Sequence, residues 1–152
     1  RLIHGQVLES WVPHVKADCI VVANDKIAGT PLQKAFMISA VPRAIRVIID
    51  TVERAAVALL SEGLAQNNVL LLLANSLDIL KIHRLGVKFS TVNIGNMHGG
   101  EGKQRVTCTI ALAPEDVLYF KELEAEGIRI VSQCIPSDRA QDWKKFLSLI
   151  GG

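Results

Sequence analysis

Cysteine is scarce in this sequence, and its spacing excludes a disulfide framework. The three cysteines, Cys19, Cys108 and Cys134, include no CxxC pair, so the spacing typical of zinc sites and of secreted disulfide scaffolds is absent. Each cysteine stands in an apolar stretch, which predicts reduced thiols in the core of a cytoplasmic protein. The four histidines are also scattered along the chain, so we predict no metal site and no cofactor.

A charge bias of either sign and a long hydrophobic run are also missing. The chain has 17 Lys+Arg against 15 Asp+Glu, and this balance argues against a nucleic-acid-binding surface. The longest apolar run, residues 69–74, is far shorter than the roughly 20 residues that cross a bilayer, and no signal peptide is visible. The hydrophobic share of 49% is nevertheless enough for a large core. We therefore predict a soluble protein with one domain over residues 1–152.

Short aliphatic runs alternate with helical patterns along the whole chain. This alternation predicts an α/β fold, with an open, mainly parallel, doubly wound sheet and helices on both faces. The predicted strands are residues 19–23, 44–50, 68–74, 87–94, 105–112 and 128–135. The predicted helices are residues 30–40, 51–62, 76–85, 114–127 and 137–150, with Thr30, Thr51 and Ser76 as N-caps of the first three.

Ligands in such sheets bind beyond the carboxyl ends of the strands. Asn24 and Asp25 follow the first predicted strand, and residues 95–98, which include Asn96 and His98, follow the fourth. We expect these residues to line a phosphate pocket or to face a partner. For His98 a role in capping its loop is equally compatible with the sequence.

The first seven residues carry the most chemical information. A helical pattern begins at about Gln6, so His4 and Gly5 occupy the turn before a helix N-terminus. Unpaired N–H groups at that position attract anions, and glycine allows the backbone to approach a phosphate closely. A neutral imidazole is a good nucleophile near pH 7, and Arg1 is near enough to contact an anion held by His4. Taken alone, these residues fit a structural histidine as well as a catalytic one.

The same segment resembles the active site of a known family. The string RLIHGQV followed by a tryptophan is similar to the phosphorylation site of the mannose/fructose/sorbose IIB components of bacterial sugar phosphotransferase systems. Further matches in the same order are Asn24-Asp25, residues 51–55, residues 93–98 and residues 134–138. Members often have an aspartate at the position of Thr30, a lysine at that of Ala74, and an acidic pair before the position of Arg1. The sequence begins at Arg1, so we expect an upstream segment in the natural chain.

The resemblance implies a function and a set of partners. His4 would accept a phosphoryl group, by family precedent at Nδ1, from a phosphohistidine IIA component. It would pass the group to a sugar held by the membrane IIC/IID permease, with Arg1 neutralising charge and with Gly5 and Gln6 beside the phosphate. No cofactor is implied. The domain would be cytoplasmic and would associate peripherally with the permease.

Two other functions fit parts of the sequence. A regulatory module would keep a phosphorylatable His4 and signal through protein contacts, although the presence of Arg1 favours transport. A flavin- or nucleotide-binding domain is disfavoured, because no diagnostic phosphate loop follows any predicted strand. The identity of the sugar and the formation of a homo-oligomer stay open at this stage.

Overall fold

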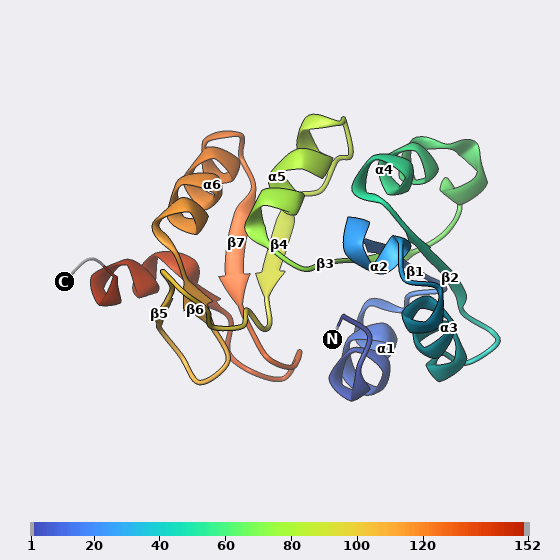
Figure 1. Ribbon diagram of the computed structural model, residues 1–152, viewed down its shortest axis with the longest axis horizontal. Coiled ribbons are helices and arrows are strands. Elements are labelled where there is room, and N and C mark those ends of the chain that lie inside the picture. The colour runs from blue at the N-terminus through green and yellow to red at the C-terminus, as the bar shows by residue number, and fades with distance from the viewer. Residues whose placement is uncertain (1, 151–152) are drawn as a thin grey trace. The chain divides into compact units, whose positions relative to one another are not determined.

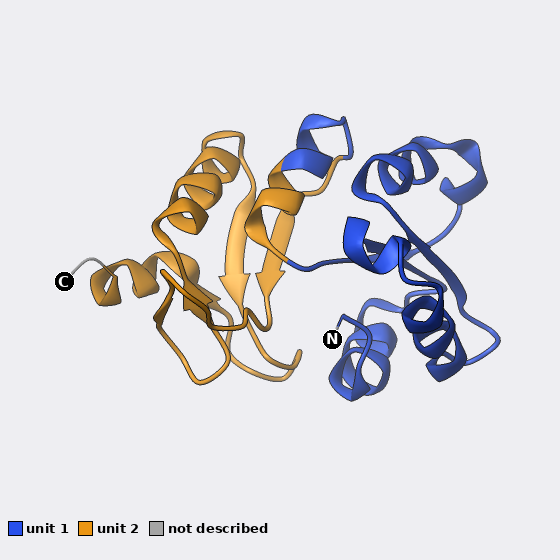
Figure 2. Ribbon diagram, viewed as in Figure 1, with its two compact units in different colours: residues 1–74, 81–87 blue, residues 75–80, 88–152 orange. Residues whose placement is uncertain are grey.

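The computed structural model describes residues 2–150, which form two compact units (Figure 2). Unit 1 comprises residues 1–74 and 81–87, and unit 2 comprises residues 75–80 and 88–152. Each unit has its own sheet with parallel strand pairs (Figure 1). No helix in the described part combines the length and apolar character needed to cross a membrane.

The sheet of unit 1 has three parallel strands in the order β2-β1-β3. The central strand β1 (Cys19–Ala23) is buried at every position, whereas β2 (Arg46–Asp50) and β3 (Val69–Leu73) are partly exposed. Ala23 pairs with both Asp50 and Leu73, so the three strands end at the same level. The strand predicted at residues 68–74 is confirmed as β3, and it is half-buried along its whole length.

The helices of unit 1 follow the sequence signals closely in some places and not in others. They are the π-helix η1 (Val7–Trp11), α1 (Val12–Val15), α2 (Asp25–Ala28), α3 (Pro31–Ala40), α4 (Val52–Leu60) and the 3-10 turn η2 (Glu62–Leu64). Thr51 caps α4 as predicted, because its side-chain oxygen accepts a hydrogen bond from the N–H of Arg54 at 3.1 Å. Thr30 lies at the predicted N-cap of α3 but makes no capping bond. Its hydroxyl donates instead to the carbonyl of Lys26.

Helix α5 (Ser76–Arg84) contributes residues 76–80 to unit 2 and residues 81–84 to unit 1. Its cap is Asn75 rather than the predicted Ser76, since the side-chain oxygen of Asn75 accepts from the N–H of Asp78 at 2.9 Å. The hydroxyl of Ser76 donates instead to Asp116, and both side chains are buried. Asn and Ser are both good N-caps, so their order in the sequence does not show which one caps the helix.

Unit 2 pairs β4 (Thr91–Ile94) with β7 (Arg129–Ser132) in parallel, and β7 with β8 (Gln141–Asp142) in antiparallel. A separate hairpin joins β5 (Gln104–Arg105) to β6 (Ala111–Leu112), where one continuous strand was predicted. Helix α6 (Pro114–Ala125) follows the hairpin. The prediction that residues 137–150 form one helix is also wrong. Residues 141–142 form β8, and the 3-10 helix η3 (Trp143–Leu149) begins only afterwards.

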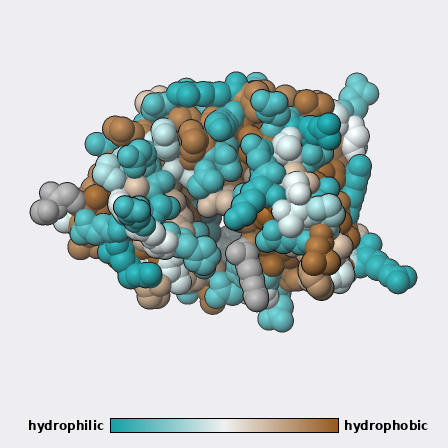
Figure 3. Space-filling view, in the orientation of Figure 1, coloured by the Kyte–Doolittle hydropathy of each residue, from teal (hydrophilic) through white to brown (hydrophobic). Residues whose placement is uncertain are grey.

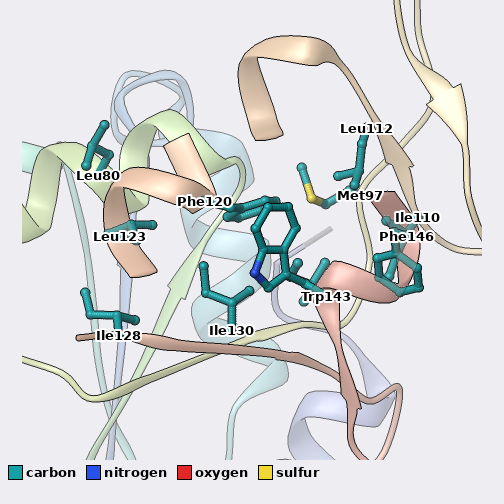
Figure 4. Packing of buried hydrophobic residues seen from close by; sticks show 11 residues of the cluster. Leu80, Met97, Ile110, Leu112, Phe120, Leu123, Ile128, Ile130, Trp143 and Phe146 are labelled. Atoms are coloured by element: carbon teal, nitrogen blue, oxygen red, sulfur yellow. The ribbon is translucent and has the colours of Figure 1, made fainter. Parts of the chain in front are cut away.

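The hydrophobic core of unit 2 explains why the C-terminal segment forms β8 and η3 and not one long helix. Trp143 is fully buried, with its ring centroid 5.3 Å from that of Phe120 on α6 (Figure 4). Ile130 of β7 and Phe146 of η3 belong to the same cluster. The 3-10 helix that begins at Trp143, directly after the short strand β8, places two large aromatic side chains in this core. Tertiary packing here overrides the helical pattern of the sequence. The predicted α/β class with mainly parallel strands is confirmed.

Candidate functional site

His4 directly precedes the first helical turn, as the sequence predicts. Its backbone carbonyl accepts a hydrogen bond from the N–H of Leu8 at 3.1 Å, while Gly5 and Gln6 are helical and exposed. The His4 side chain is half-buried, so it is not enclosed by the core. The first N–H groups of a helix have no carbonyl acceptor within the helix, which makes this end of the helix suited to an anion.

The backbone leaves space next to His4. A Cβ atom added at Gly5 would meet no heavy atom within 4 Å outside the neighbouring residues. An anion close to the backbone would therefore not compete with packed side chains at this position. Gly5 is helical and not in a left-handed turn. The absence of a side chain at this position therefore leaves open space, and no unusual backbone angle requires a glycine here.

The helix after His4 is unusual in its first two turns. Val12 donates its N–H to the carbonyl of Val7, five residues earlier, which is the π-helical pattern. The next residue, Pro13, has no N–H to donate to Glu9. The sequence predicts a helix here but not its π form. Single π-helical turns are rare in proteins and are frequently found at functional sites.

Two buried side chains hold the His4 segment against the rest of unit 1. Ile3 and Val7 flank His4 in sequence and are both buried. They belong to one hydrophobic cluster with Val22 of β1 and Ile27 of α2. His4 is therefore fixed at the margin of the core that also carries the end of the central strand and the short helix after it.

Asn24 and Asp25 lie after this central strand and make structural hydrogen bonds. The side-chain oxygen of Asn24 accepts from the N–H of Ile27 at 2.9 Å and so caps α2, a helix that the sequence analysis did not predict. The carboxylate of Asp25 accepts from the N–H of Val52 at 2.9 Å and so links α2 to the start of α4. Asn24 is half-buried and Asp25 is exposed. Both are thus positioned at the strand ends, in the same unit as His4.

Asn96 and His98 belong to unit 2 and are both exposed. Between them, Met97 is buried and forms a bridge with Ile110, in which its N–H donates to the carbonyl of Thr109 at 2.8 Å. Because side chains alternate along extended backbone, burial of Met97 directs its two neighbours toward solvent. The structure does not assign Asn96 or His98 to the His4 pocket.

The remaining predicted residues have simpler outcomes. Arg1, the predicted phosphate clamp, lies outside the described residues. His14 is exposed, and its ring stands edge-on to that of Trp11 at 6.1 Å. Between residues 2 and 150, no three His, Cys, Asp or Glu side chains are grouped so as to hold a metal ion.

The cysteines are free, but their predicted burial is only partly right. Cys19 is buried in β1, Cys134 is half-buried, and Cys108 is exposed in the turn between β5 and β6. Burial raises the pKa of the Cys19 thiol, the Asp18 carboxylate raises this pKa further, and the Arg46 guanidinium lowers it. The apolar letters around Cys108 predicted one long strand, and a hairpin turn exposes the residue instead.

One buried polar pair was missed by the sequence analysis. Asp116 in the first turn of α6 accepts from the hydroxyl of Ser76 through one oxygen and from the N–H of Ala113 at 2.7 Å through the other. It therefore fixes the starts of two helices, α5 and α6. The sequence signal was an aspartate in the first turn after Pro114, which indicates capping but does not identify Ser76 as a partner.

The fold and this site define a class of protein: an α/β domain that presents a half-buried histidine at the N-terminus of a helix, on the margin of the core that carries a parallel sheet. Comparison with known proteins defines the family. The model of the sorbose-subfamily IIB components of PTS systems matches residues 1–150. The chain belongs to this family of phosphotransferase-system IIB components, which take part in sugar uptake.

Individual relatives agree with this assignment. The N-acetylgalactosamine-specific phosphotransferase enzyme IIB component 2 of Escherichia coli K12 is 32% identical, over 97% of this chain and 93% of its own length. The fructose-specific EIIB component of Bacillus subtilis 168 is 29% identical, over 97% and 90%. The solved IIBSor domain of the Klebsiella pneumoniae sorbose permease is 28% identical, with a TM-score of 0.93 over 99% of this chain and 93% of that one.

Proposed function

We propose that this chain is a phosphoryl carrier in which His4 accepts a phosphoryl group from a phosphohistidine IIA component and transfers it to a sugar bound by the membrane IIC/IID permease. The observation that carries the proposal is the position of His4, half-buried and immediately ahead of a helix N-terminus, with open space at Gly5. A histidine enclosed in the core could not reach a partner's phosphoryl group.

Each transfer exchanges one bond to phosphorus for another. In the first step, a ring nitrogen of His4 attacks the phosphorus, and the bond from phosphorus to the IIA histidine breaks. In the second step, a sugar hydroxyl attacks, the bond to His4 breaks and the hydroxyl loses its proton. Such transfers depend mainly on positioning and charge stabilisation. We assign attachment to Nδ1 of His4, and charge stabilisation to the N–H groups of Gly5 and Gln6 and to the guanidinium of Arg1.

The other predicted residues take supporting roles in this proposal. Asn24 and Asp25 position the strand end next to the His4 segment through their hydrogen bonds to Ile27 and Val52. Asn96 and His98, which are exposed on unit 2, face a protein partner. Both units act together as one IIB domain in the cytoplasm, in peripheral association with the permease.

The sugar is not read by this domain in the proposed mechanism. The two curated relatives described above are named for different sugars, N-acetylgalactosamine and fructose, although both align along nearly the whole chain. This fits a carrier whose sugar is held by the membrane subunits.

The direct test is phosphorylation in a reconstituted system. The purified chain is incubated with phosphoenolpyruvate, the general carrier proteins and candidate IIA components, and the labelled residue is mapped by mass spectrometry under alkaline conditions. Label on His4 that chases onto sugar in permease-containing membranes supports a transport role. Label that stays on His4 in the presence of permease and sugar indicates the regulatory alternative, and label on another residue contradicts the proposal.

A further inference from the structure

Helix α3 (Pro31–Ala40) has an outer surface that is unusual for a helix facing water. Eight of its ten residues are exposed and none of the eight is charged. Leu32 and Phe36 are 68% and 67% exposed and lie one turn apart, and Ile38 is 47% exposed. Figure 3 shows hydrophobic side chains at the surface at the lower right, where Figure 1 has α3.

The polar groups of this surface do not make it hydrophilic. The hydroxyl of Ser39 donates to the carbonyl of Phe36 at 2.8 Å, so it is satisfied within the helix. The only charged residue of α3, Lys34, is half-buried, and Met37 faces the core. An ordinary surface helix has its charged residues on the side away from the core. The outer side of α3 has the opposite composition, which indicates that another surface covers it.

The charge around α3 restricts what this other surface is. Residues 26–49 contain no aspartate or glutamate, and their charged residues are all basic: Lys26, Lys34, Arg43 and Arg46. Lys26 and Arg43 are exposed on either side of the helix in sequence, and Lys26 is on α2, which packs against α3. Arg46 is directed elsewhere, since it donates to the carbonyl of Gly63. The α3 surface is therefore apolar with a basic border. The nearest acidic residue in sequence, the exposed Asp25 beside Lys26 on α2, accepts a hydrogen bond from the N–H of Val52 at the start of α4.

A second copy of the chain is a poor match for this surface. Two copies paired through α3 would bring the basic borders of both together, while the Asp25 carboxylate of each copy is bonded to the N–H of Val52, and like charges at close range oppose association. A protein partner usually presents both signs of charge. A uniformly anionic surface with an apolar layer beneath it matches both features, and this is the composition of a membrane interface with acidic lipids.

We propose that the outer side of α3, defined by Leu32 and Phe36, flanked by the less exposed Ile38 and bordered by Lys26 and Arg43, contacts an anionic lipid surface. Phe36 and Leu32 enter the boundary between headgroups and acyl chains, while the basic side chains stay at the headgroups. A single short helix gives weak, reversible binding of this kind. The inference does not depend on phosphorylation of His4.

Vesicle sedimentation tests the proposal with the intact chain. We expect binding to vesicles with about one third phosphatidylglycerol, little binding to pure phosphatidylcholine vesicles, and loss of binding in 1 M salt, where the Debye length is only about 3 Å. The variant Leu32→Ser/Phe36→Ser should lose the binding. Lys26→Gln and Arg43→Gln should each weaken it about fivefold, which corresponds to roughly 1 kcal/mol per basic residue near an anionic surface.

A matched control is present on α4. Val57 and Leu60 are 70% and 58% exposed, but α4 also carries Glu53 in its first turn, and Glu62 follows shortly after it. Val57→Ser/Leu60→Ser therefore removes similar apolar area from a surface with acidic groups and should leave vesicle binding unchanged. Circular dichroism and the melting temperature verify that both double variants are folded.

Four outcomes would overturn the proposal: no binding to anionic vesicles, equal loss of binding in the α3 and α4 variants, self-association that the α3 variant abolishes, or binding only to membranes that contain the permease. The last two results would assign α3 to a second copy or to a protein partner. Labelling of His4 by a phosphorylated IIA component should be normal in the α3 variant, so failure of this inference is distinguishable from failure of the proposed function.

Discussion

The backbone carbonyl of His4 accepts the N–H of Leu8 at 3.1 Å, so the residue that carries the proposed reactive imidazole also starts the first helix. This bond uses only main-chain atoms and does not depend on the side chain at position 4. Chemistry and helix formation can therefore be separated by substitution.

His4→Ala should abolish the acid-labile, base-stable label that a phosphorylated IIA component places on the chain. Because the Leu8 bond is retained, the melting temperature should change by no more than a few degrees. His14→Ala is the matched control, since His14 is exposed on the same helical segment and should be labelled as the wild type is. Full labelling of the His4 variant would show that the phosphoryl group resides elsewhere.

Arg1→Ala should slow transfer from His4 to sugar more than it slows labelling of His4. The proposed guanidinium stabilises charge on the phosphoryl group as it leaves for a hydroxyl, a role that commonly contributes several orders of magnitude in related phosphoryl transfers. Arg1→Lys should recover only part of the rate, because lysine lacks the planar fork. Rapid-quench measurement of both steps checks this, and an equal effect on the two steps would reduce Arg1 to a loop-shaping role.

The sequence predicts best where one local signal determines the structure. The aliphatic run of β1 and the Thr51 cap of α4 were predicted correctly, because a buried strand and a threonine before a helix require no knowledge of distant residues. The position of His4 ahead of a helix followed from the same kind of signal. These elements include the candidate site at His4 in unit 1.

The failures have long-range causes. The C-terminal pattern looks helical, but burial of Trp143 against Phe120 requires a strand and a 3-10 helix. The pair of Ser76 and Asp116 joins residues 40 positions apart, and no local pattern identifies such a partner. Asn24 was expected to line a pocket or to face a partner, and only the hydrogen bond that it accepts from the N–H of Ile27 shows that it caps α2.

Asp25→Ala should destabilise the domain by about 1 kcal/mol, because the N–H of Val52 loses the carboxylate at the start of α4. Thr51→Ala removes the cap from the N–H of Arg54, three residues further on, and should cost a similar amount. Chemical denaturation measures both. The comparison also tests the pocket role of Asp25: if it only positions α4, the two variants should be labelled by IIA at the same rate once folded, and a selective loss for Asp25→Ala would place its carboxylate in the reaction.

Ser76 and Asp116 should show strong coupling in a double-mutant cycle. Ser76→Ala leaves one buried carboxylate oxygen without its donor, and Asp116→Ala removes the acceptor of both Ser76 and Ala113. Buried groups left in this way cost roughly 1–3 kcal/mol. The double variant should therefore be more stable than the sum of the single effects predicts, by at least 0.5 kcal/mol for residues in direct contact. Additive free energies of unfolding would mean that the hydroxyl and the carboxylate do not depend on each other.

Cys19 should give the stability a distinct dependence on alkaline pH. Burial raises the pKa of its thiol, so the unfolded chain releases this proton at a lower pH than the folded chain does. The stabilisation is complete below the unfolded thiol pKa of about 8.5 and is lost as the pH rises above it toward the folded value. Between pH 8 and 10 the free energy of unfolding should fall more steeply for the wild type than for Cys19→Ala.

The other thiols provide the control for this effect. Cys108 is exposed, so Cys108→Ser should retain the steep wild-type fall in stability and lose the fastest phase of labelling by a thiol reagent. Cys19 should react only on unfolding. Its sulfur is buried in the centre of the sheet, where a thiol reagent cannot reach it and where the reactive thiolate is disfavoured. Rapid modification of Cys19 in the folded protein at pH 8 would mean that β1 opens far more readily than its complete burial and its two hydrogen-bonded neighbours suggest.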